Sequence, residues 1–259
     1  MYEWLVLGWC CYTDKVKLRH IRRWPGYIAL VSVLLVAIVA VVGRLQIGDT
    51  QPVAQAEFDP IVFDEVEPKD LDWPSYGQAA IATRDYGVLE LHGDTAPQPT
   101  ASIAKLITLL AILKKEPISD GHGGTITFGQ SDVELYRKYL AGNGTHTPVS
   151  VGLEWSQYRA LQAVIYDSSN NVSDSLAIWA FGSLEAYRSY AQDMVSQLGM
   201  DSTTIGVDAS GYSPTTSSTA HDMALLAIEI MNHPVASEIV GQPEVDLPGA
   251  GLRRNTSWM

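Results

Sequence analysis

Residues 99–115 read PTASIAKLITLLAILKK, and this stretch constrains the rest of the chain most strongly. Its apolar pattern predicts a mostly buried helix over Ser102–Lys115 that ends before Pro117. Ser102 and Lys105 stand three residues apart, so they share a face of that helix and the amine can reach the hydroxyl. A serine hydroxyl becomes a strong nucleophile only when a base removes its proton, and a lysine with a lowered pKa can be that base. The pattern predicts a catalytic pair, although an N-cap serine with an exposed lysine gives the same Ser-x-x-Lys spacing.

A second polar motif lies between two predicted helices, where residues 168–170 read Ser-Ser-Asn. In Ser-x-x-Lys enzymes a Ser-x-Asn forms the second wall of the cleft. There the Ser168 hydroxyl can relay a proton to the leaving group, and the Asn170 amide can hold the substrate backbone. A shift of one residue would nominate Ser169 and Asn171 instead. The tripeptide also fits a plain interhelical turn that caps the next helix.

The segments around these motifs predict a mixed domain. Residues 78–83 and 88–91 alternate as two short strands joined by a turn, and residues 125–128 form a third strand candidate. Helical periodicity recurs in four further segments, at residues 156–167, 172–181, 184–198 and 220–232. Strands followed by several helices indicate an α/β fold of the α+β, three-layer type.

The composition excludes one class of partner. The 259 residues carry a net charge of -12, and binding to a phosphate backbone requires clustered Lys and Arg, so we expect no nucleic-acid partner. The six histidines have no metal-ligand spacing, and Cys10 and Cys11 have no nearby histidine or second pair, so the sequence predicts no metal site.

The N-terminal region predicts a membrane segment. Residues 28–43 read IALVSVLLVAIVAVVG without a charge, and a basic cluster precedes them. The positive-inside rule places such a cluster in the cytoplasm, so everything after Arg44 is expected outside. We expect an uncleaved single-pass anchor in a cytoplasmic membrane. A cleaved signal peptide is the alternative, because Ala54-Gln55-Ala56 resembles a cleavage site.

The predicted organisation has four parts. A basic cytoplasmic N-terminus (residues 1–26) precedes the anchor (residues 27–44). Residues 45–74 are rich in acidic residues and proline and predict an extended linker. The remaining residues, 75–259, form the predicted catalytic domain.

Together the motifs resemble those of the serine D-alanyl-D-alanine carboxypeptidases, the low-molecular-mass penicillin-binding proteins. Their nucleophile segment usually reads PAS-x-x-K-x-x-T, which Ser102, Lys105 and Thr108 match, while Thr100 replaces the proline. Their second segment resembles SGNDAANALA, which is similar to SSNNVSDSLA at residues 168–177. Two further resemblances follow in the family's order: DASGY with STAHDM at residues 208–212 and 218–223, and LPG with RNTS at residues 247–249 and 254–257.

The resemblance implies the penicillin-recognising serine hydrolase fold, an antiparallel sheet flanked by helices. It implies Ser102 as nucleophile, Lys105 as base, Ser168 as proton relay and Asn170 as a substrate-binding residue, with no cofactor. It implies a peptidoglycan stem peptide as substrate and β-lactams as acylating inhibitors. Such an enzyme would lie on the outer face of a bacterial cytoplasmic membrane. There it would release the terminal D-Ala from the stem peptide.

The sequence leaves alternatives open. A β-lactamase of related fold would need a deacylating glutamate, for which Glu185 is the available residue. A non-catalytic wall-binding relative is the second alternative, because the family's third motif, Lys-Thr/Ser-Gly, is absent from the 259 residues. We expect a continuation of the chain to supply that motif and the last strands of the sheet. Carboxypeptidase, endopeptidase and transpeptidase activities are not distinguished by these motifs.

Overall fold

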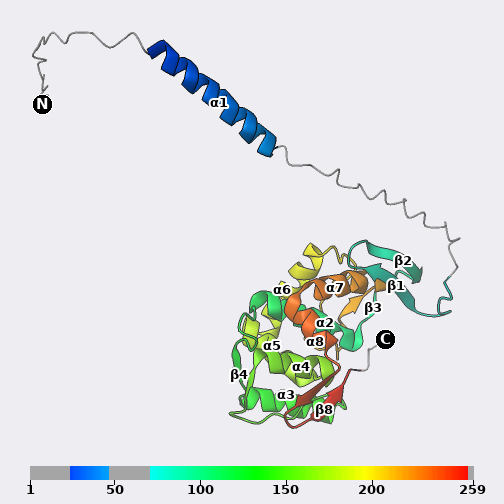
Figure 1. Ribbon diagram of the computed structural model, residues 1–259. Helices are drawn as coiled ribbons and strands as arrows, with labels where there is room; N and C mark the ends of the chain where they lie inside the picture. Colours follow the sequence, from blue (N-terminus) through cyan, green and yellow to red (C-terminus); the bar gives the residue numbers. More distant parts are fainter. Residues whose placement is uncertain (1–23, 47–70, 256–259) are drawn as a thin grey trace, which may run out of the picture. The chain divides into compact units, whose positions relative to one another are not determined.

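The helix that carries the Ser-x-x-Lys motif lies at the centre of the folded domain. In the computed structural model, which describes residues 24–46 and 71–255, α2 (Ala104–Lys115) is buried over most of its length. It contacts each of the helices α4 to α8 (Figure 1). The predicted buried helix is confirmed, but its first turn differs from the prediction. Ser102 lies in a short 3₁₀ turn, η1 (Ala101–Ile103), that leads into α2.

Seven further helices and eight strands are described. The helices are α1 Trp24–Gln46, α3 Gln130–Ala141, α4 Gln157–Tyr166, α5 Asn170–Phe181, α6 Leu184–Gln197, α7 Ala220–Asn232 and α8 Pro234–Gly241. The strands are β1 Gln78–Thr83, β2 Gly87–Gly93, β3 Gln98–Pro99, β4 Thr125–Thr127, β5 Glu154–Ser156, β6 Ser217–Ser218, β7 Glu244–Leu247 and β8 Gly251–Arg254.

The strands pair in four antiparallel two-stranded sheets: β1 with β2, β3 with β6, β4 with β5 and β7 with β8. The hairpin predicted from residues 78–91 is β1–β2, which packs against α7. The β7–β8 hairpin packs against α4. The mixed α/β class and the antiparallel pairing expected from the sequence are confirmed.

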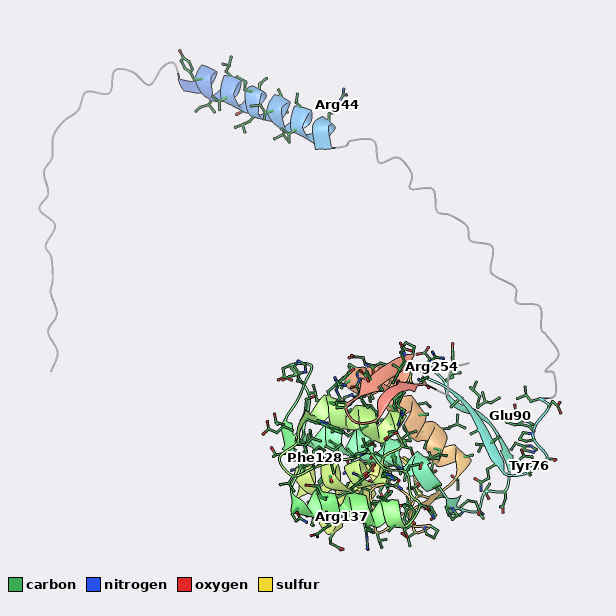
Figure 2. The ribbon with its side chains drawn as sticks, turned by 90° about the horizontal axis from the view of Figure 1, so that it is seen from below. Arg44, Tyr76, Glu90, Phe128, Arg137 and Arg254 are labelled. Carbon is green, nitrogen blue, oxygen red and sulfur yellow. The ribbon has the colours of Figure 1, made fainter. Side chains whose placement is uncertain are left out.

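The core forms where the helices meet. Ile107, Leu110 and Ile112 of α2 are fully buried and belong to one apolar cluster with residues of α4 to α8. Figure 2 shows Phe128 within the domain, whereas Arg137 and Arg254 lie at its surface. Burial of apolar surface is the main stabilising contribution to such a domain.

Two of the described helices were not expected from the sequence. In α3 only Tyr139 is buried, because the segment is mostly polar and lies on the outside of α5. In α8, Pro234 occupies the first turn, where its missing N–H has no effect on helix hydrogen bonding. The same proline that ends α7 therefore starts the next helix.

The chain divides into two compact units, Met1–Lys69 and Asp70–Met259. Within the first, residues 26–44 of α1 have a mean hydropathy of 2.7 and are unburied. A helix of 23 residues is about 34 Å long, enough for a hydrocarbon core of about 30 Å. Such a helix is consistent with a membrane span or a signal sequence. Several predictions fall outside the described residues: the basic cluster before residue 24, Cys10 and Cys11, most of the linker with Ala54-Gln55-Ala56, and residues 256–259.

Candidate active site

The turn that carries Ser102 is fixed by backbone contacts from a distant loop. The Thr100 amide donates to the Thr216 carbonyl, 3.0 Å away, directly beside the short β3–β6 sheet. Ala101 adopts a left-handed φ of 47°. Gly211 packs directly on this residue, and a Cβ at position 211 would collide with the Ala101 carbonyl oxygen. Ser102 itself is exposed, so its hydroxyl is available to a substrate.

Lys105 lies beneath Ser102 and is almost fully buried, with 2% of its surface exposed. Its Nζ lies 3.0 Å from Ser102 Oγ, 2.7 Å from Asn170 Oδ1 and 2.9 Å from the Ser210 carbonyl oxygen. Desolvation by burial lowers the pKa of Lys105 to about 8, and the carboxylates of Asp208 and Asp174 oppose this shift. A neutral amine has two N–H groups and one lone pair. With Asn170 and Ser210 accepting the two N–H bonds, the lone pair can face the Ser102 hydroxyl.

Ser168 approaches Ser102 from the turn between α4 and α5. Its Oγ lies 3.0 Å from Ser102 Oγ and donates to it. Ser168 has a left-handed φ of 47°, which is uncommon for a residue other than glycine. Thr145 stabilises this turn: its Oγ1 donates to the Ser168 carbonyl, and its own carbonyl accepts from the Asn170 amide at 3.0 Å.

Ser169 and Asn171, the pair given by the shifted register, face the opposite side of the turn. Both are fully buried, and both accept a hydrogen bond from the Thr147 amide. Ser169 is also the N-cap of α5, where its hydroxyl accepts from the Val172 amide. Ser168 and Asn170 are therefore the pair that contacts Ser102 and Lys105, while the neighbouring pair anchors the turn.

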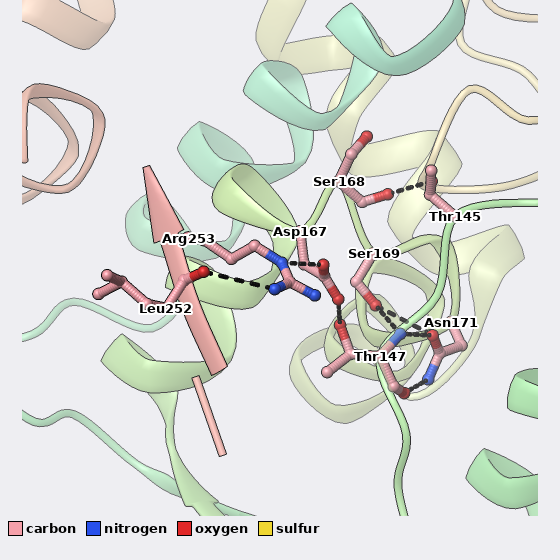
Figure 3. Close-up of polar contacts among 8 residues, drawn as sticks. All are labelled: Thr145, Thr147, Asp167, Ser168, Ser169, Asn171, Leu252 and Arg253. Carbon is pink, nitrogen blue, oxygen red and sulfur yellow. Dashed lines mark hydrogen bonds and ion pairs between the residues drawn. The ribbon is translucent and has the colours of Figure 1, made fainter. Parts of the chain in front are cut away.

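The turn is also linked to the β7–β8 hairpin. Arg253 Nε donates to Asp167 Oδ1 at 2.8 Å, and Thr147 Oγ1 donates to Asp167 Oδ2 at 2.6 Å (Figure 3). Asp167 is the residue immediately before Ser168 and the C-cap of α4. A cation from the β7–β8 hairpin thus fixes one end of the turn that carries Ser168.

Several of these contributors were missed by the sequence reasoning. Ser210 contributes a backbone carbonyl, which has no side-chain signature. Asp208 accepts from Ser210 N, Ser210 Oγ, Tyr212 N and Ser213 N, so it shapes the loop that presents this carbonyl. The Asp-x-Ser-Gly pattern was the available signal for that loop. Thr145 and Arg253 had no local signal.

Metal ligation and deacylation by Glu185 have no support in the described part of the chain. Groups of His, Cys, Asp and Glu that could hold a metal ion are absent from the described residues. Glu185 is exposed in the first turn of α6, and among the described residues it makes no hydrogen bond or ion pair with the Ser102 site.

Comparison with known proteins shows the family of this chain. The family model described as D-alanyl-D-alanine carboxypeptidase matches residues 80–255, so the chain belongs to that family. A search of curated proteins gives no match.

The chain is similar in structure to three solved proteins. The first is a penicillin-binding protein homologue from Mycobacterium tuberculosis (TM-score 0.59, 22% identity, 69% of this chain and 65% of that one). The second is a D-alanyl-D-alanine carboxypeptidase from the same organism (TM-score 0.60, 23% identity, 74% of this chain and 72% of that one). The third is penicillin-binding protein 6B from Escherichia coli (TM-score 0.61, 18% identity, 74% of this chain and 60% of that one). These likenesses show the fold. The chain spans less than two thirds of the length of the first and third proteins.

Proposed function

We propose that this protein is a serine-type D-alanyl-D-alanine carboxypeptidase that acts on peptidoglycan stem peptides, with Ser102 as nucleophile. One observation carries the proposal: Ser102 Oγ lies 3.0 Å from both Lys105 Nζ and Ser168 Oγ. A base and a proton relay within hydrogen-bond distance of one exposed hydroxyl is the arrangement that acyl transfer requires. Membership of the D-alanyl-D-alanine carboxypeptidase family supports the choice of substrate.

The reaction begins with attack of Ser102 Oγ on the carbonyl carbon of the penultimate D-Ala. As the new C–O bond forms, the hydroxyl proton moves to neutral Lys105. The C–N bond to the terminal D-Ala then breaks, and the leaving nitrogen takes a proton through Ser168. Water hydrolyses the resulting ester and restores Ser102. Asn170 accepts a hydrogen bond from Lys105 and positions the peptide. The backbone N–H of Ser102, within η1, is one donor for the oxyanion.

The site in this proposal lies on the outer side of a cytoplasmic membrane, with α1 as the anchor. The apolar character of α1 and the cell-wall substrate of the family support this localisation. β-Lactams are the expected acylating inhibitors, because the same nucleophile would open their ring.

Covalent labelling of the full chain with a fluorescent penicillin tests the proposal. We expect Ser102→Ala to abolish labelling. Ser131→Ala is the matched control, because Ser131 is an exposed serine on α3, and it should label like the wild type. Labelling that survives in Ser102→Ala would move the nucleophile elsewhere.

Two assays separate the alternatives: turnover of a stem pentapeptide by the unlabelled protein, and loss of the penicilloyl group from the labelled protein. Release of D-Ala from a stem pentapeptide, with slow loss of the penicilloyl group, is expected. Rapid release of the penicilloyl group would indicate a β-lactamase. A folded protein that neither labels nor releases D-Ala would indicate a non-catalytic wall-binding relative.

A further inference from the structure

A buried carboxylate that the proposed reaction does not use lies close to its base. Asp174 of α5 is fully buried. Its Oδ2 accepts from the Tyr139 hydroxyl at 2.6 Å, and its Oδ1 accepts from the Ala209 amide at 2.9 Å. Asp174 follows Asn170 by one helical turn, so both side chains lie on the face of α5 directed at Lys105. An ionised carboxylate in such a position is unfavourable unless it is paired or hydrogen-bonded, as it is here.

Through Ala209, Asp174 fixes the backbone that Lys105 contacts. The Ala209 carbonyl accepts from Thr108 Oγ1 at 2.6 Å, and the next carbonyl, of Ser210, accepts from Lys105 Nζ at 2.9 Å. Two consecutive peptide groups are therefore held between α5 and α2. If Asp174 loses its bond to Ala209, the Ser210 carbonyl is no longer fixed against the amine.

Asp174 also acts on Lys105 through its charge. Among the described residues, the titratable groups that act on Lys105 are Asp208 on the loop and Asp174 on α5. Tyr139 on α3 and Tyr187 on α6 interact in turn with these two carboxylates. Burial raises the pKa of both tyrosines, so they stay neutral in the working range. The two carboxylates are the negative groups that favour protonated Lys105.

Opposing effects act on the ionisation of Asp174, and their net result is a raised pKa. Burial raises the pKa of Asp174, and the charge of Asp208 adds to this effect, while the bonds from Tyr139 and Ala209 and the charge of Lys138 lower it. The two hydrogen-bond donors are directed at the carboxylate oxygens and favour the charged form.

We infer that Asp174 is a positioning residue for acylation: it fixes the 209–210 backbone against Lys105, and its negative charge favours the protonated form of that amine. This inference rests on the proposed function, since it assumes that Lys105 is the base. It assigns a role to a residue that touches neither substrate nor nucleophile.

The test compares acylation rates by a fluorescent penicillin between pH 5.5 and 9.5. Asp174→Asn keeps the shape of the side chain: its Oδ1 can accept from Ala209, and its amide can donate to the Tyr139 oxygen. The charge is lost, and the hydrogen bond with Tyr139 reverses its direction. We expect the pH of half-maximal acylation to fall by about 0.5–1 unit, because a nearby negative charge favours protonated lysine. Each rate is then expressed as a fraction of the same protein's plateau rate. Near pH 6.5 this fraction should be about three to ten times larger for Asp174→Asn than for the wild type.

Thr108→Val is the matched control, because it removes the other hydrogen bond to residue 209 without changing a charge. It should lower the plateau and leave the half-maximal pH unchanged. If Asp174→Asn does not fold, as judged by circular dichroism, Asp174→Ser carries the same test with a smaller neutral side chain.

The outcomes separate the inference from the proposed function. Suppose that the wild type is acylated and that the Asp174 variant folds. If the half-maximal pH of the variant is then unchanged or higher, the inference is overturned and the proposed function still stands. A wild type that is not acylated at Ser102 would overturn the proposed function, and the inference with it. A lower half-maximal pH in Asp174→Asn, without such a change in Thr108→Val, supports the inference.

Discussion

Lys105 is the residue whose chemistry depends most on its surroundings. An exposed lysine is protonated at neutral pH and cannot accept a proton. Burial lowers the pKa of Lys105 to about 8, so a useful fraction of the amine is neutral in the physiological range. The two acceptors provided by Asn170 and Ser210 then orient the amine towards Ser102. Burial and hydrogen bonding therefore act on the same atom, and each is needed for general-base catalysis.

At this scale we predict the pH profile of acylation. The neutral amine predominates above the lysine pKa, so the rate should rise through about pH 8 and level off above it. Lys105→Met should slow acylation by on the order of 10²–10⁴-fold and remove this dependence, because proton removal contributes about that factor. Lys115→Met, on an exposed position of the same helix, is the control and should behave like the wild type. A pH profile that is unchanged in Lys105→Met would assign the base to another group.

At the scale of elements, the site depends on turns held by contacts from other parts of the fold. The turn from Asp167 to Asn170 joins α4 to α5 and is fixed by Thr145 and by the β7–β8 hairpin. Its left-handed residue, Ser168, is the one that reaches Ser102. Non-glycine residues adopt this conformation only when their surroundings compensate the strain. The β7–β8 hairpin therefore helps to place the Ser168 hydroxyl, although it makes no hydrogen bond with that hydroxyl.

We predict that Arg253→Gln weakens this placement. The Asp167 carboxylate would keep only its bond from Thr147, so stability should fall by about 1 kcal/mol, a value limited by the exposure of the arginine. Acylation should slow by roughly tenfold, because small displacements of reacting groups reduce rates steeply. Arg254→Gln is the matched control: its side chain is 80% exposed and lies 3.8 Å from Glu244. Equal effects of the two substitutions on the acylation rate would contradict a specific role for Arg253.

At the scale of the whole molecule, the basic cluster, the apolar helix and the folded domain follow each other along the chain. The order of the first two predicts the side of the membrane on which the domain folds. α1 has the length and hydropathy that a span requires, and a signal sequence would have them too. A membrane anchor and a cleaved signal sequence would both place the domain on the same side of the membrane, but the mature protein would begin at different residues.

We predict that a reporter active only in the cytoplasm is inactive when fused after residue 70. A reporter active only outside the cytoplasm, fused at the same position, is the control and should work. Cytoplasmic activity at this fusion would reverse the topology. N-terminal sequencing of the mature protein then tests the anchor, because an N-terminus at Glu57 would show cleavage after Ala56.

The sequence by itself determined the features that depend on neighbours along the chain. Apolar periodicity gave the buried α2 and most of the helices around it, and the short hairpin followed from its turn. The three-residue spacing brought Lys105 to Ser102, as the 3.0 Å contact confirms. Polar α3 was missed because its segment has little apolar periodicity, and α8 because its proline was taken only as an end signal.

The tertiary structure decided everything that depends on contacts between distant residues. Ser168 lies 66 positions from Ser102, and Ser210 lies 105 positions from Lys105, so local pattern could not place them together. The left-handed turns at Ala101 and Ser168 carry no glycine and had no sequence signal. The lowered pKa of Lys105 and the raised pKa of Asp174 arise only after folding, because desolvation needs the assembled core. The sequence therefore specified which residues could react, and packing of the helices specified how they meet.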